Sequence, residues 1–382
     1  MKSFTIKITL VIIVGLFFSC NQKKAVGTEK NSIVQAPKSI EVLVGTYTSG
    51  ESKGIYKLAF NPINGVIINK GLVAEIENPS YLTLSNDKKR VYAIGENEKG
   101  SVSVFQWNKE RTKLELEQQL LVQGMHPCYI NINSTEKMLS IANYSSGNVS
   151  FFKMDIDGAV LESPQIRTHD VSSIINPQQE KPHAHCSKFS RDGKFLFVAD
   201  LGIDEIVGYA IDENNDLSQK FIALKMDAGD GPRHFVFHPT KDIMYVVNEI
   251  SNTIIVAALN QITGKFTKIQ KQTALPQDFE GASYGGDIQI SEDARFLYAT
   301  NRGHNSIAIF SISDEGMLKL IGTESVRGDW PRNFTLSPKG DFLLVANQKS
   351  NNITVFEVNK KTGLLIFTGN ELALDMPVCI KF

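Results

Sequence analysis

Three short strand-like segments recur along this chain in the same order, and the chain ends on a lone copy of the first. The first segment opens on a turn residue and continues as a β-branched or aromatic run, as in Pro232–Phe237 and Pro331–Leu336. The second follows a polar turn, as in Phe195–Ala199, and the third follows an Asn- or Gly-rich turn, as in Asn352–Phe356. Runs of this composition between turn residues are typical of β-strands.

A looser fourth strand completes each repeat, and the period of roughly 45 to 57 residues is typical of propeller blades. The first unit, from Glu41 to Glu75, has only strands two to four, and the final segment, Pro377–Phe382, is a first strand with nothing after it. We therefore predict an all-β, seven-bladed β-propeller whose ring closes when this C-terminal strand completes the first blade. Closure removes a sheet edge that would otherwise invite association. A β-sandwich does not explain seven similar units, one of them split.

The residues before the first repeat have the features of an export signal. Lys2 and Lys7 flank the start of the chain, and the apolar run Ile8–Phe18 follows. This run is too short to span a membrane but suits a secretory signal. The pair Ser19-Cys20 resembles the end of a lipoprotein signal, in which Cys20 becomes the lipidated first residue. An ordinary cleaved signal is the alternative.

These features divide the chain into three parts. We predict a signal peptide at residues 1–19, a lipid-anchored tether at 20–38 and the propeller domain at 39–382. The protein is then exported to the cell envelope, facing the periplasm or the surface, and meets the membrane only through a lipid at Cys20. We expect a monomer.

Charge and cysteine content exclude several classes of partner. The formal net charge is −1, and no basic cluster is interleaved with aromatic residues, so nothing indicates a nucleic-acid partner. Besides Cys20, the chain has Cys128, Cys186 and Cys379, each in a first segment of a different repeat. Their number is odd and no metal-binding spacing occurs, so we interpret them as buried core thiols and expect neither a metal nor a cofactor.

Positions that differ between repeats and become polar are the best candidates for function. The second residue of the first segment is, in chain order, Ser80, Cys128, His185, Arg233, Gly286, Arg332 and Val378. The third residue is Tyr81, Tyr129, Cys186, His234, Asp287, Asn333 and Cys379. The residue just past the second segment is Glu96, Tyr144, Leu201, Glu249, Arg302 and Gln348.

An antiparallel hairpin of the first two segments brings these positions to the same end of each blade. If the first segment is the innermost strand, they border the mouth of the central channel. We therefore predict one convergent polar group, made of His185, Arg233, Glu249, Asp287, Arg302 and Arg332. A pocket with a histidine, a glutamate and three arginines suits an anionic substrate.

Some of these residues have structural alternatives. His183 and His185 lie two apart on one strand and could hold a metal, but no third ligand is marked. The register shared with Arg233 favours His185 as the residue that faces the channel, although a bulge would exchange the two. Glu249 and Arg302 could form a purely structural ion pair between adjacent blades.

Over about residues 40–382 the chain resembles the seven-bladed lactonase family, which includes propeller-type 6-phosphogluconolactonases and fungal carboxy-muconate lactonizing enzymes. The motifs that carry this resemblance are Val44–Thr48, Pro182–His185, Phe195–Gly202, Gly231–Pro239, Val247–Glu249, Asp287–Ser291 and Pro331–Phe334. The resemblance implies an active-site set of His, Arg, Glu and Arg. It corresponds here to His185 (or His183), Arg233, Glu249 and Arg302.

We therefore expect a carboxylic-ester hydrolase that opens an anionic sugar-acid lactone, most like 6-phosphoglucono-δ-lactone. His185 or Glu249 would act as general base, an arginine would stabilise the oxyanion, and the remaining polar residues, among them His183, Asp287 and Arg332, would bind substrate. Two alternatives remain open at this stage. One is a muconate-type lactonizing isomerase, and the other is a non-catalytic binding or scaffold propeller in the envelope.

Overall fold

The computed structural model of the protein describes residues 1, 5, 38–170 and 177–382. Apart from residues 1 and 5, the predicted signal peptide lies outside the described residues, as do Cys20 and the tether up to residue 37. Residues Pro37–Phe382 form one compact unit. None of the described residues belongs to a helix with the length and hydropathy that a membrane span requires.

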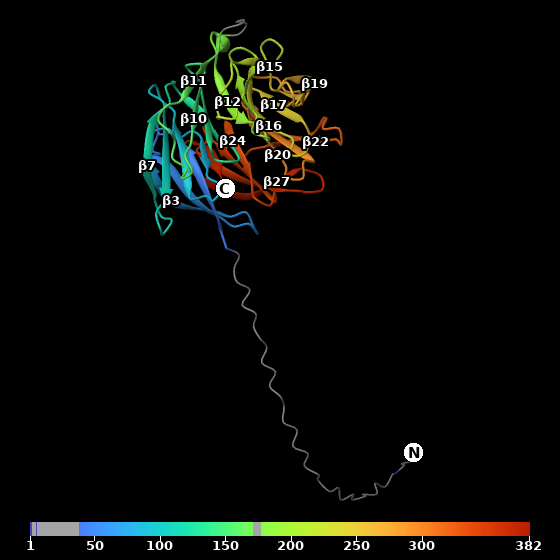
Figure 1. The fold of residues 1–382 in the computed structure, drawn as a ribbon. Coiled ribbons are helices and arrows are strands. Elements are labelled where there is room, and N and C mark those ends of the chain that lie inside the picture. Colours follow the sequence, from blue (N-terminus) through green and yellow to red (C-terminus); the bar gives the residue numbers. More distant parts are fainter. Residues whose placement is uncertain (2–4, 6–37, 171–176) are drawn as a thin grey trace, which may run out of the picture. The chain divides into compact units, whose positions relative to one another are not determined.

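The described residues of this unit form seven four-stranded antiparallel sheets, arranged as the blades of a propeller (Figure 1). Blade 1 consists of β28 (Pro377–Lys381), β1 (Ile40–Thr46), β2 (Gly54–Phe60) and β3 (Ile67–Glu75). Blade 2 consists of β4 (Leu82–Leu84), β5 (Arg90–Gly95), β6 (Ser101–Trp107) and β7 (Leu114–Leu121). Blade 3 consists of β8 (Pro127–Ile132), β9 (Met138–Asn143), β10 (Asn148–Lys153) and β11 (Gln165–Thr168).

The later blades repeat this order. Blade 4 consists of β12 (Ala184–Phe189), β13 (Phe195–Asp200), β14 (Glu205–Ala210) and β15 (Phe221–Lys225). Blade 5 consists of β16 (Pro232–Phe237), β17 (Ile243–Asn248), β18 (Thr253–Leu259) and β19 (Phe266–Thr273). Blade 6 consists of β20 (Tyr284–Ile290), β21 (Phe296–Arg302), β22 (Ser306–Ile312) and β23 (Leu318–Ser325). Blade 7 consists of β24 (Pro331–Leu336), β25 (Phe342–Asn347), β26 (Asn352–Val358) and β27 (Leu365–Ala373), and a short 3-10 turn, Pro177–Gln179, precedes blade 4.

The last strand closes the ring, which confirms the predicted seven-bladed architecture. β28 pairs antiparallel with β1, and Val44 lies opposite Ile380. The backbone N–H of Ile380 also donates to Asn333 Oδ1 of blade 7 at 2.7 Å. On the other side, Leu82 N–H of blade 2 lies 3.4 Å from Cys379 Sγ. The closing strand is therefore bonded to blades 1, 2 and 7.

Apolar side chains between the sheets form the core. The second strands β13, β17, β21 and β25 are buried along their whole length, as expected for strands covered on both faces. Cys128, Cys186 and Cys379 are free thiols and buried, as the sequence predicted.

A recurrent β-bulge explains how the inner strands present polar residues to the channel. In blade 5, Pro232 lies opposite Asn248 while His234 lies opposite Val247, so Arg233 is the extra residue. Blades 3, 4 and 7 have the same register shift at Cys128, His185 and Arg332. A bulge re-aims the side chain of its extra residue. The second and third residues of the inner strands can therefore both line the channel, in two layers.

Blade 2 departs from this rule. Its inner strand begins only at Leu82, whereas the sequence predicted a start at Pro79. Asn78 has a left-handed backbone (φ 45), and its carbonyl accepts a hydrogen bond from Ser80 N–H at 2.7 Å. The segment nevertheless keeps backbone hydrogen bonds to the β4–β5 hairpin, from Glu96 N–H to Asn78 O at 3.0 Å and from Ile94 N–H to Tyr81 O at 3.3 Å.

Candidate active site

A carboxylate held by two arginines forms the centre of the mouth. Glu249 directly follows β17, Arg233 is the bulged residue of β16, and Arg302 ends β21 of the next blade. Arg233 Nε lies 2.9 Å and Arg302 Nη2 lies 2.6 Å from the same oxygen, Glu249 Oε2. The two guanidinium groups are almost completely buried, with 2% and 4% of their side chains exposed. The sequence left open whether Glu249 and Arg302 form a structural or a catalytic pair. In the structure Arg233 binds the same carboxylate, so either role belongs to a cluster of three residues.

Backbone carbonyls of blade 6 fix both guanidinium groups. Arg233 Nη1 donates to Gly286 O at 2.8 Å, and Arg302 Nη2 donates to Gly285 O at 2.7 Å. A Cβ at Gly286 would lie 2.3 Å from Thr300 Oγ1, so this position requires glycine. Gly286 stands at the second position of its inner strand, where blades 4, 5 and 7 have a charged or polar residue. Close packing beside Arg233 explains why this position is glycine.

The charges in this cluster stabilise one another. Burial raises the pKa of the Glu249 carboxyl, but Arg302 and Arg233 outweigh burial, so that the net shift of this pKa is downward. Burial lowers the pKa of Arg302 to about 10, partly offset by Glu249. At neutral pH Glu249 is therefore ionised and Arg302 is charged.

His185 provides a neutral imidazole in the same mouth. Its ring packs edge-on against Tyr144 and His234, with centroids 5.7 Å and 5.1 Å away. Its Nδ1 is buried and has no hydrogen-bond partner among the described residues. Burial first, and then the charge of Arg233, hold the pKa of His185 well below its ordinary value. The imidazole is therefore neutral at pH 7 and has a lone pair to accept a proton.

The neighbouring His183 is already engaged. Its Nδ1 lies 2.9 Å from the carbonyl oxygen of Tyr144, and its ring stacks on the Tyr144 ring at 4.2 Å. Its backbone N–H donates to Asp200 Oδ1 at 2.7 Å. The structure thus favours His185 for chemistry and His183 for holding the wall of the mouth, while direct contact of either with substrate stays a prediction.

Among the described residues, Arg332 differs from Arg233 and Arg302 in having no carboxylate within ion-pair distance. Its guanidinium carbon lies 5.2 Å from the centroid of the Tyr47 ring. The Tyr47 hydroxyl lies 3.0 Å from both carboxylate oxygens of Glu96. In the part of the chain that the structure describes, no residue accepts a hydrogen bond from the Arg332 guanidinium. Its charge also lowers the pKa of His185, so the two residues belong to the same site.

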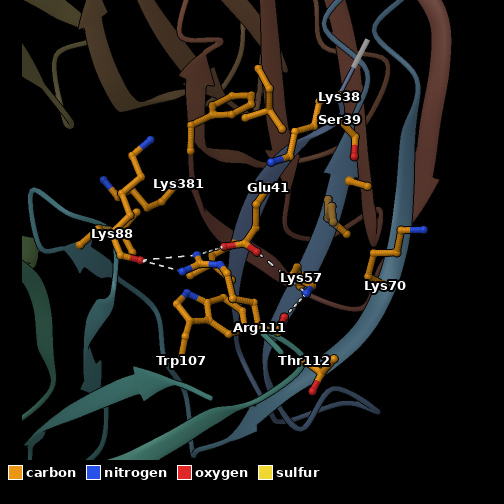
Figure 2. A pocket seen from close by; sticks show the side chains of 16 residues that line it. Lys38, Ser39, Glu41, Lys57, Lys70, Lys88, Trp107, Arg111, Thr112 and Lys381 are labelled. Atoms are coloured by element: carbon orange, nitrogen blue, oxygen red, sulfur yellow. Dashed lines mark hydrogen bonds and ion pairs between the residues drawn. The ribbon is translucent and has the colours of Figure 1, made fainter. Parts of the chain in front are cut away.

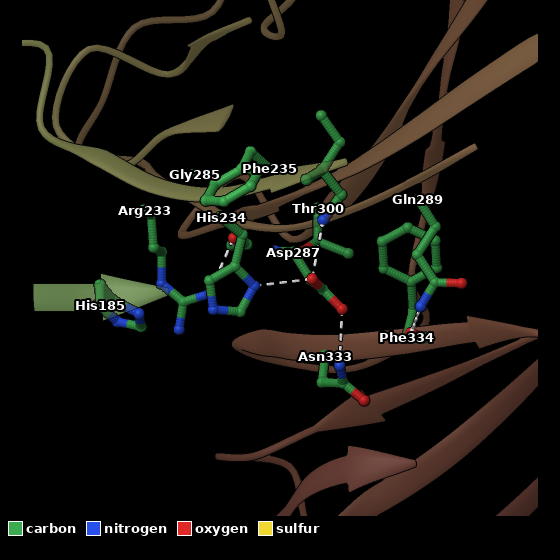
Figure 3. Close-up of polar contacts among 12 residues, drawn as sticks. His185, Arg233, His234, Phe235, Gly285, Asp287, Gln289, Thr300, Asn333 and Phe334 are labelled. Carbon is green, nitrogen blue, oxygen red and sulfur yellow. Dashed lines mark hydrogen bonds and ion pairs between the residues drawn. The ribbon is translucent and has the colours of Figure 1, made fainter. Parts of the chain in front are cut away.

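Polar residues at the third position of the inner strands form a second layer, made of His234, Asp287 and Asn333 (Figure 3). His234 Nδ1 lies 2.8 Å from Asp287 Oδ1, and Asn333 Nδ2 donates to Asp287 Oδ2 at 2.6 Å. His234 Nε2 in turn lies 3.3 Å from Arg233 Nη1. The predicted substrate-binding residue Asp287 therefore has both carboxylate oxygens occupied by neighbouring blades. This geometry favours a positioning role, through His234 and Arg233, over direct contact with substrate.

Four residues of the mouth were not singled out from the sequence: Tyr47, Glu96, Tyr144 and His234. Glu96 and Tyr144 stand in the variable position after the second segment, and His234 stands in the variable third position. The comparison of the blades could therefore have identified these three residues as site candidates. Tyr47 occupies the same position in blade 1, just past β1, and its backbone N–H donates to Met376 O as that of Glu249 donates to Gly231 O. The sequence comparison did not include blade 1 at this position.

The fold and this site define a seven-bladed propeller protein with an arginine-rich mouth. The chain belongs to the lactonase family described as "Lactonase, 7-bladed beta-propeller", which matches residues 41–382.

Several proteins similar to this chain are named as lactonases. The chain is 33% identical to the 6-phosphogluconolactonase of Bacillus subtilis over 341 residues, which cover 89% of this chain and 97% of the relative. It is 37% identical to the 6-phosphogluconolactonase of Formosa agariphila over 345 residues, which cover 87% and 97% of the two chains. Among solved structures, the periplasmic gluconolactonase of Pseudomonas aeruginosa superposes with a TM-score of 0.84 at 30% identity, covering 90% of this chain and 98% of the other.

Proposed function

We propose that this protein hydrolyses the lactone of a sugar acid, most like 6-phosphoglucono-δ-lactone to 6-phosphogluconate. Membership of the lactonase family and the names of two relatives support this activity. The observation that carries the proposal is the position of His185, a neutral imidazole with an unpartnered Nδ1 among the charges of three arginines.

In the proposed mechanism, water attacks the lactone carbonyl carbon and His185 takes the proton of that water. The base is weak in the free protein, because the nearby arginines lower the pKa of His185. A bound anionic substrate offsets part of their charge and so raises this pKa toward the range that general-base catalysis requires. The ring C–O bond then breaks, and the proton passes to the departing ring oxygen, which becomes a hydroxyl group.

The Arg233–Glu249–Arg302 cluster stabilises the negative charge that develops on the carbonyl oxygen. Both guanidinium groups are fixed by Glu249 and by blade 6 carbonyls before substrate arrives, so little reorganisation is needed. Loss of one such donor typically slows catalysis by about a hundredfold or more. Glu249 is in this account the residue that holds the arginines in place.

Arg332 binds the phosphate. A guanidinium with no hydrogen-bond acceptor among the described residues suits a bidentate contact with phosphate or carboxylate. The test compares hydrolysis of 6-phosphoglucono-δ-lactone and unphosphorylated gluconolactone by the wild-type protein and the Arg332→Ala variant, with Arg233→Ala as the baseline for spontaneous hydrolysis. We expect Arg332→Ala to raise KM for the phosphorylated lactone alone.

The same experiment decides between the substrates. Equal acceleration of both lactones, unaffected by Arg332→Ala, would overturn the phosphate assignment and leave a gluconolactonase. No acceleration of either lactone would overturn the hydrolase proposal.

We also propose that the protein is an exported, monomeric lipoprotein without a nucleic-acid partner. The apolar run Ile8–Phe18 followed by Cys20 supports export and lipidation, and one solved relative is itself a periplasmic enzyme. The test is fractionation of cells that make the wild-type protein or Cys20→Ala. The wild-type protein should sediment with membranes and incorporate radiolabelled palmitate, and the variant should do neither. Equal behaviour of the two proteins would contradict the anchor.

A further inference from the structure

A basic cavity lies at the end of blades 1 and 2 opposite the mouth (Figure 2). Its volume is about 630 Å³. β1 begins at Ile40 beside the cavity and runs toward the mouth, where the bulge at Thr46 lies, so the two sites are at opposite ends of the same strand. The basic side chains that line the cavity are Lys38, Lys57, Lys70, Lys88, Arg111 and Lys381.

The acidic side chain in this lining, Glu41, is already paired. Its Oε1 accepts a hydrogen bond from Arg111 Nη2, and its Oε2 lies 3.9 Å from Lys57 Nζ. Lys57 Nζ also donates to the carbonyl oxygen of Arg111. Glu41 therefore holds two of the cations in place without neutralising the rest of the cavity.

The remaining four lysines form no ion pair in the described part of the chain, although the charge of Lys381 partly offsets the rise that burial causes in the pKa of Asp287. Lys38, Lys70 and Lys88 are exposed, and Lys381 Nζ lies 4.3 Å from the centroid of the Tyr81 ring. In Figure 2 the side chain of Lys38 lies above Glu41, and Lys381 lies to the left beside Lys88. A group of like charges around one cavity creates a positive potential that attracts an anion.

Some other lysines at this end of the propeller are paired with aspartates. Lys89 lies 3.1 Å from Asp87, and Lys194 lies 3.4 Å from Asp192. Lys360 lies 2.6 Å from Asp341. These three lysines are neutralised by a carboxylate, whereas Lys38, Lys70 and Lys88 of the cavity form no ion pair within the described part of the chain.

The wall of the cavity is apolar beneath the lysines. Leu43 and Leu58 line it and are buried, and Phe382 closes one side. The Trp107 ring is covered by Lys57 and Arg111, at 5.1 Å and 4.8 Å from its centroid. Because these cations occupy the indole, the cavity suits an aliphatic group below an anionic one better than a stacked base.

We propose that this cavity binds the headgroup of an anionic phospholipid and so docks this end of the propeller on a membrane. A phosphodiester next to glycerol and acyl carbons combines the charge and the apolar surface that the lining requires. The described chain enters the propeller at Lys38, inside this cavity, after the segment in which Cys20 is the predicted lipid site. That upstream segment carries Lys23, Lys24 and Lys30, so like charge disfavours it as the occupant.

Docking in this way would direct the mouth away from the bilayer, toward soluble substrate. The proposal does not depend on the proposed lactonase activity, because the two sites lie at opposite ends of the propeller. Hydrolysis rates therefore serve as a check that variants of the cavity fold correctly.

The test uses residues 37–382, which contain all seven blades and the strand pair that closes the ring. Co-sedimentation is measured with vesicles of phosphatidylcholine alone and with vesicles that also contain phosphatidylglycerol. We expect binding only to the phosphatidylglycerol vesicles. The double variant Lys70→Glu/Lys88→Glu should bind them at least about tenfold more weakly.

A matched control separates the cavity from general charge. The variant Lys194→Glu/Lys360→Glu has the same net charge and also changes lysines at this end, but outside the cavity. It should bind vesicles more strongly than the cavity variant, close to wild type. Equal loss in the two variants, or no wild-type binding to phosphatidylglycerol vesicles, would overturn the proposal. Titration with glycerol 3-phosphate provides the second arm, and binding of this soluble ester without binding of vesicles would overturn the lipid assignment.

Discussion

Arg302 Nη2 lies 2.6 Å from Glu249 Oε2, and this contact joins the mouth ends of blades 5 and 6. The same oxygen also lies 2.9 Å from Arg233 Nε of blade 5. One carboxylate thus holds two guanidinium groups in fixed positions at the mouth. This arrangement is available only because the propeller brings residues from separate repeats to one channel.

Replacement of Glu249 by glutamine should lower kcat for lactone hydrolysis by about a hundredfold, because two arginines lose the charge that holds them. Measurement of kcat and KM tests this prediction. Glu41→Gln is the matched control, since Glu41 also pairs with an arginine but at the opposite end of the propeller. The control should keep wild-type kcat, and an equal loss in both variants would show a general effect on the fold.

Acid should destabilise the protein through two buried histidines. Burial and the charge of Arg233 hold the pKa of His185 and of His234 well below the ordinary value. An unfolded chain titrates histidine near about 6.5, so below that pH the unfolded state binds more protons than the folded state. The free energy of unfolding therefore falls as pH decreases from about 6.5 toward the folded-state pKa, by up to about 1.4 kcal/mol per pH unit for each histidine.

Urea denaturation at about pH 7.5 and about pH 5.5 measures this loss. The His185→Gln variant should lose less stability on acidification than the wild-type protein. A variant that remains as sensitive to acid as wild type would show that His185 does not contribute.

The Asp287–Asn333 contact predicts that a double substitution repairs a single one. In Asp287→Asn, the new amide would face the Asn333 amide nitrogen, which now donates to Asp287 at 2.6 Å. A buried donor without an acceptor costs about 1 to 3 kcal/mol. Asp287→Asn/Asn333→Asp restores a donor–acceptor pair and can still accept from Ile380 N–H, so most of the unfolding free energy should return.

Activity separates the role of the Asp287 charge from that of its hydrogen bonds. In the double variant His234 faces a neutral amide, so kcat should remain below wild type although stability recovers. Full recovery of both quantities would contradict the positioning role of the carboxylate, and failure of stability to recover would contradict the hydrogen-bond account.

The closing strand should contribute strongly to stability. Ile380 is 1% exposed between blades 1 and 7, and its truncation to alanine should lower the free energy of unfolding by about 2 to 5 kcal/mol. Ile366→Ala on the outer strand β27 is the control, because that side chain is 57% exposed. Urea denaturation of the two variants tests the difference, and similar small losses would indicate that the ring is not closed by β28.

The fold could be predicted almost completely from the sequence because it is built from a repeat. Each strand is short and local, and the unpaired segment Pro377–Phe382 matched the unit that begins at Glu41 without a first strand. Only local turns escaped this comparison, as at Asn78, where a left-handed residue delays the start of β4.

The site was predicted less completely, because its geometry depends on the bulge in the inner strands. The repeat comparison placed His185, Arg233 and Arg332 together, but it could not show that the following residues form a second layer. Asp287 was therefore assigned to substrate, whereas its carboxylate is bonded to His234 and Asn333. The sequence also could not show that His183, and not His185, is hydrogen-bonded to the backbone carbonyl of Tyr144, because a pattern of side chains does not reveal backbone contacts.

The central claim is that His185 is the base of a lactone hydrolase. The most direct measurement is kcat/KM for 6-phosphoglucono-δ-lactone with the wild-type protein, His185→Ala and His183→Ala, corrected for spontaneous hydrolysis. The account predicts a loss of about a hundredfold or more for His185→Ala and a smaller loss for His183→Ala. Wild-type kcat/KM in His185→Ala would contradict it.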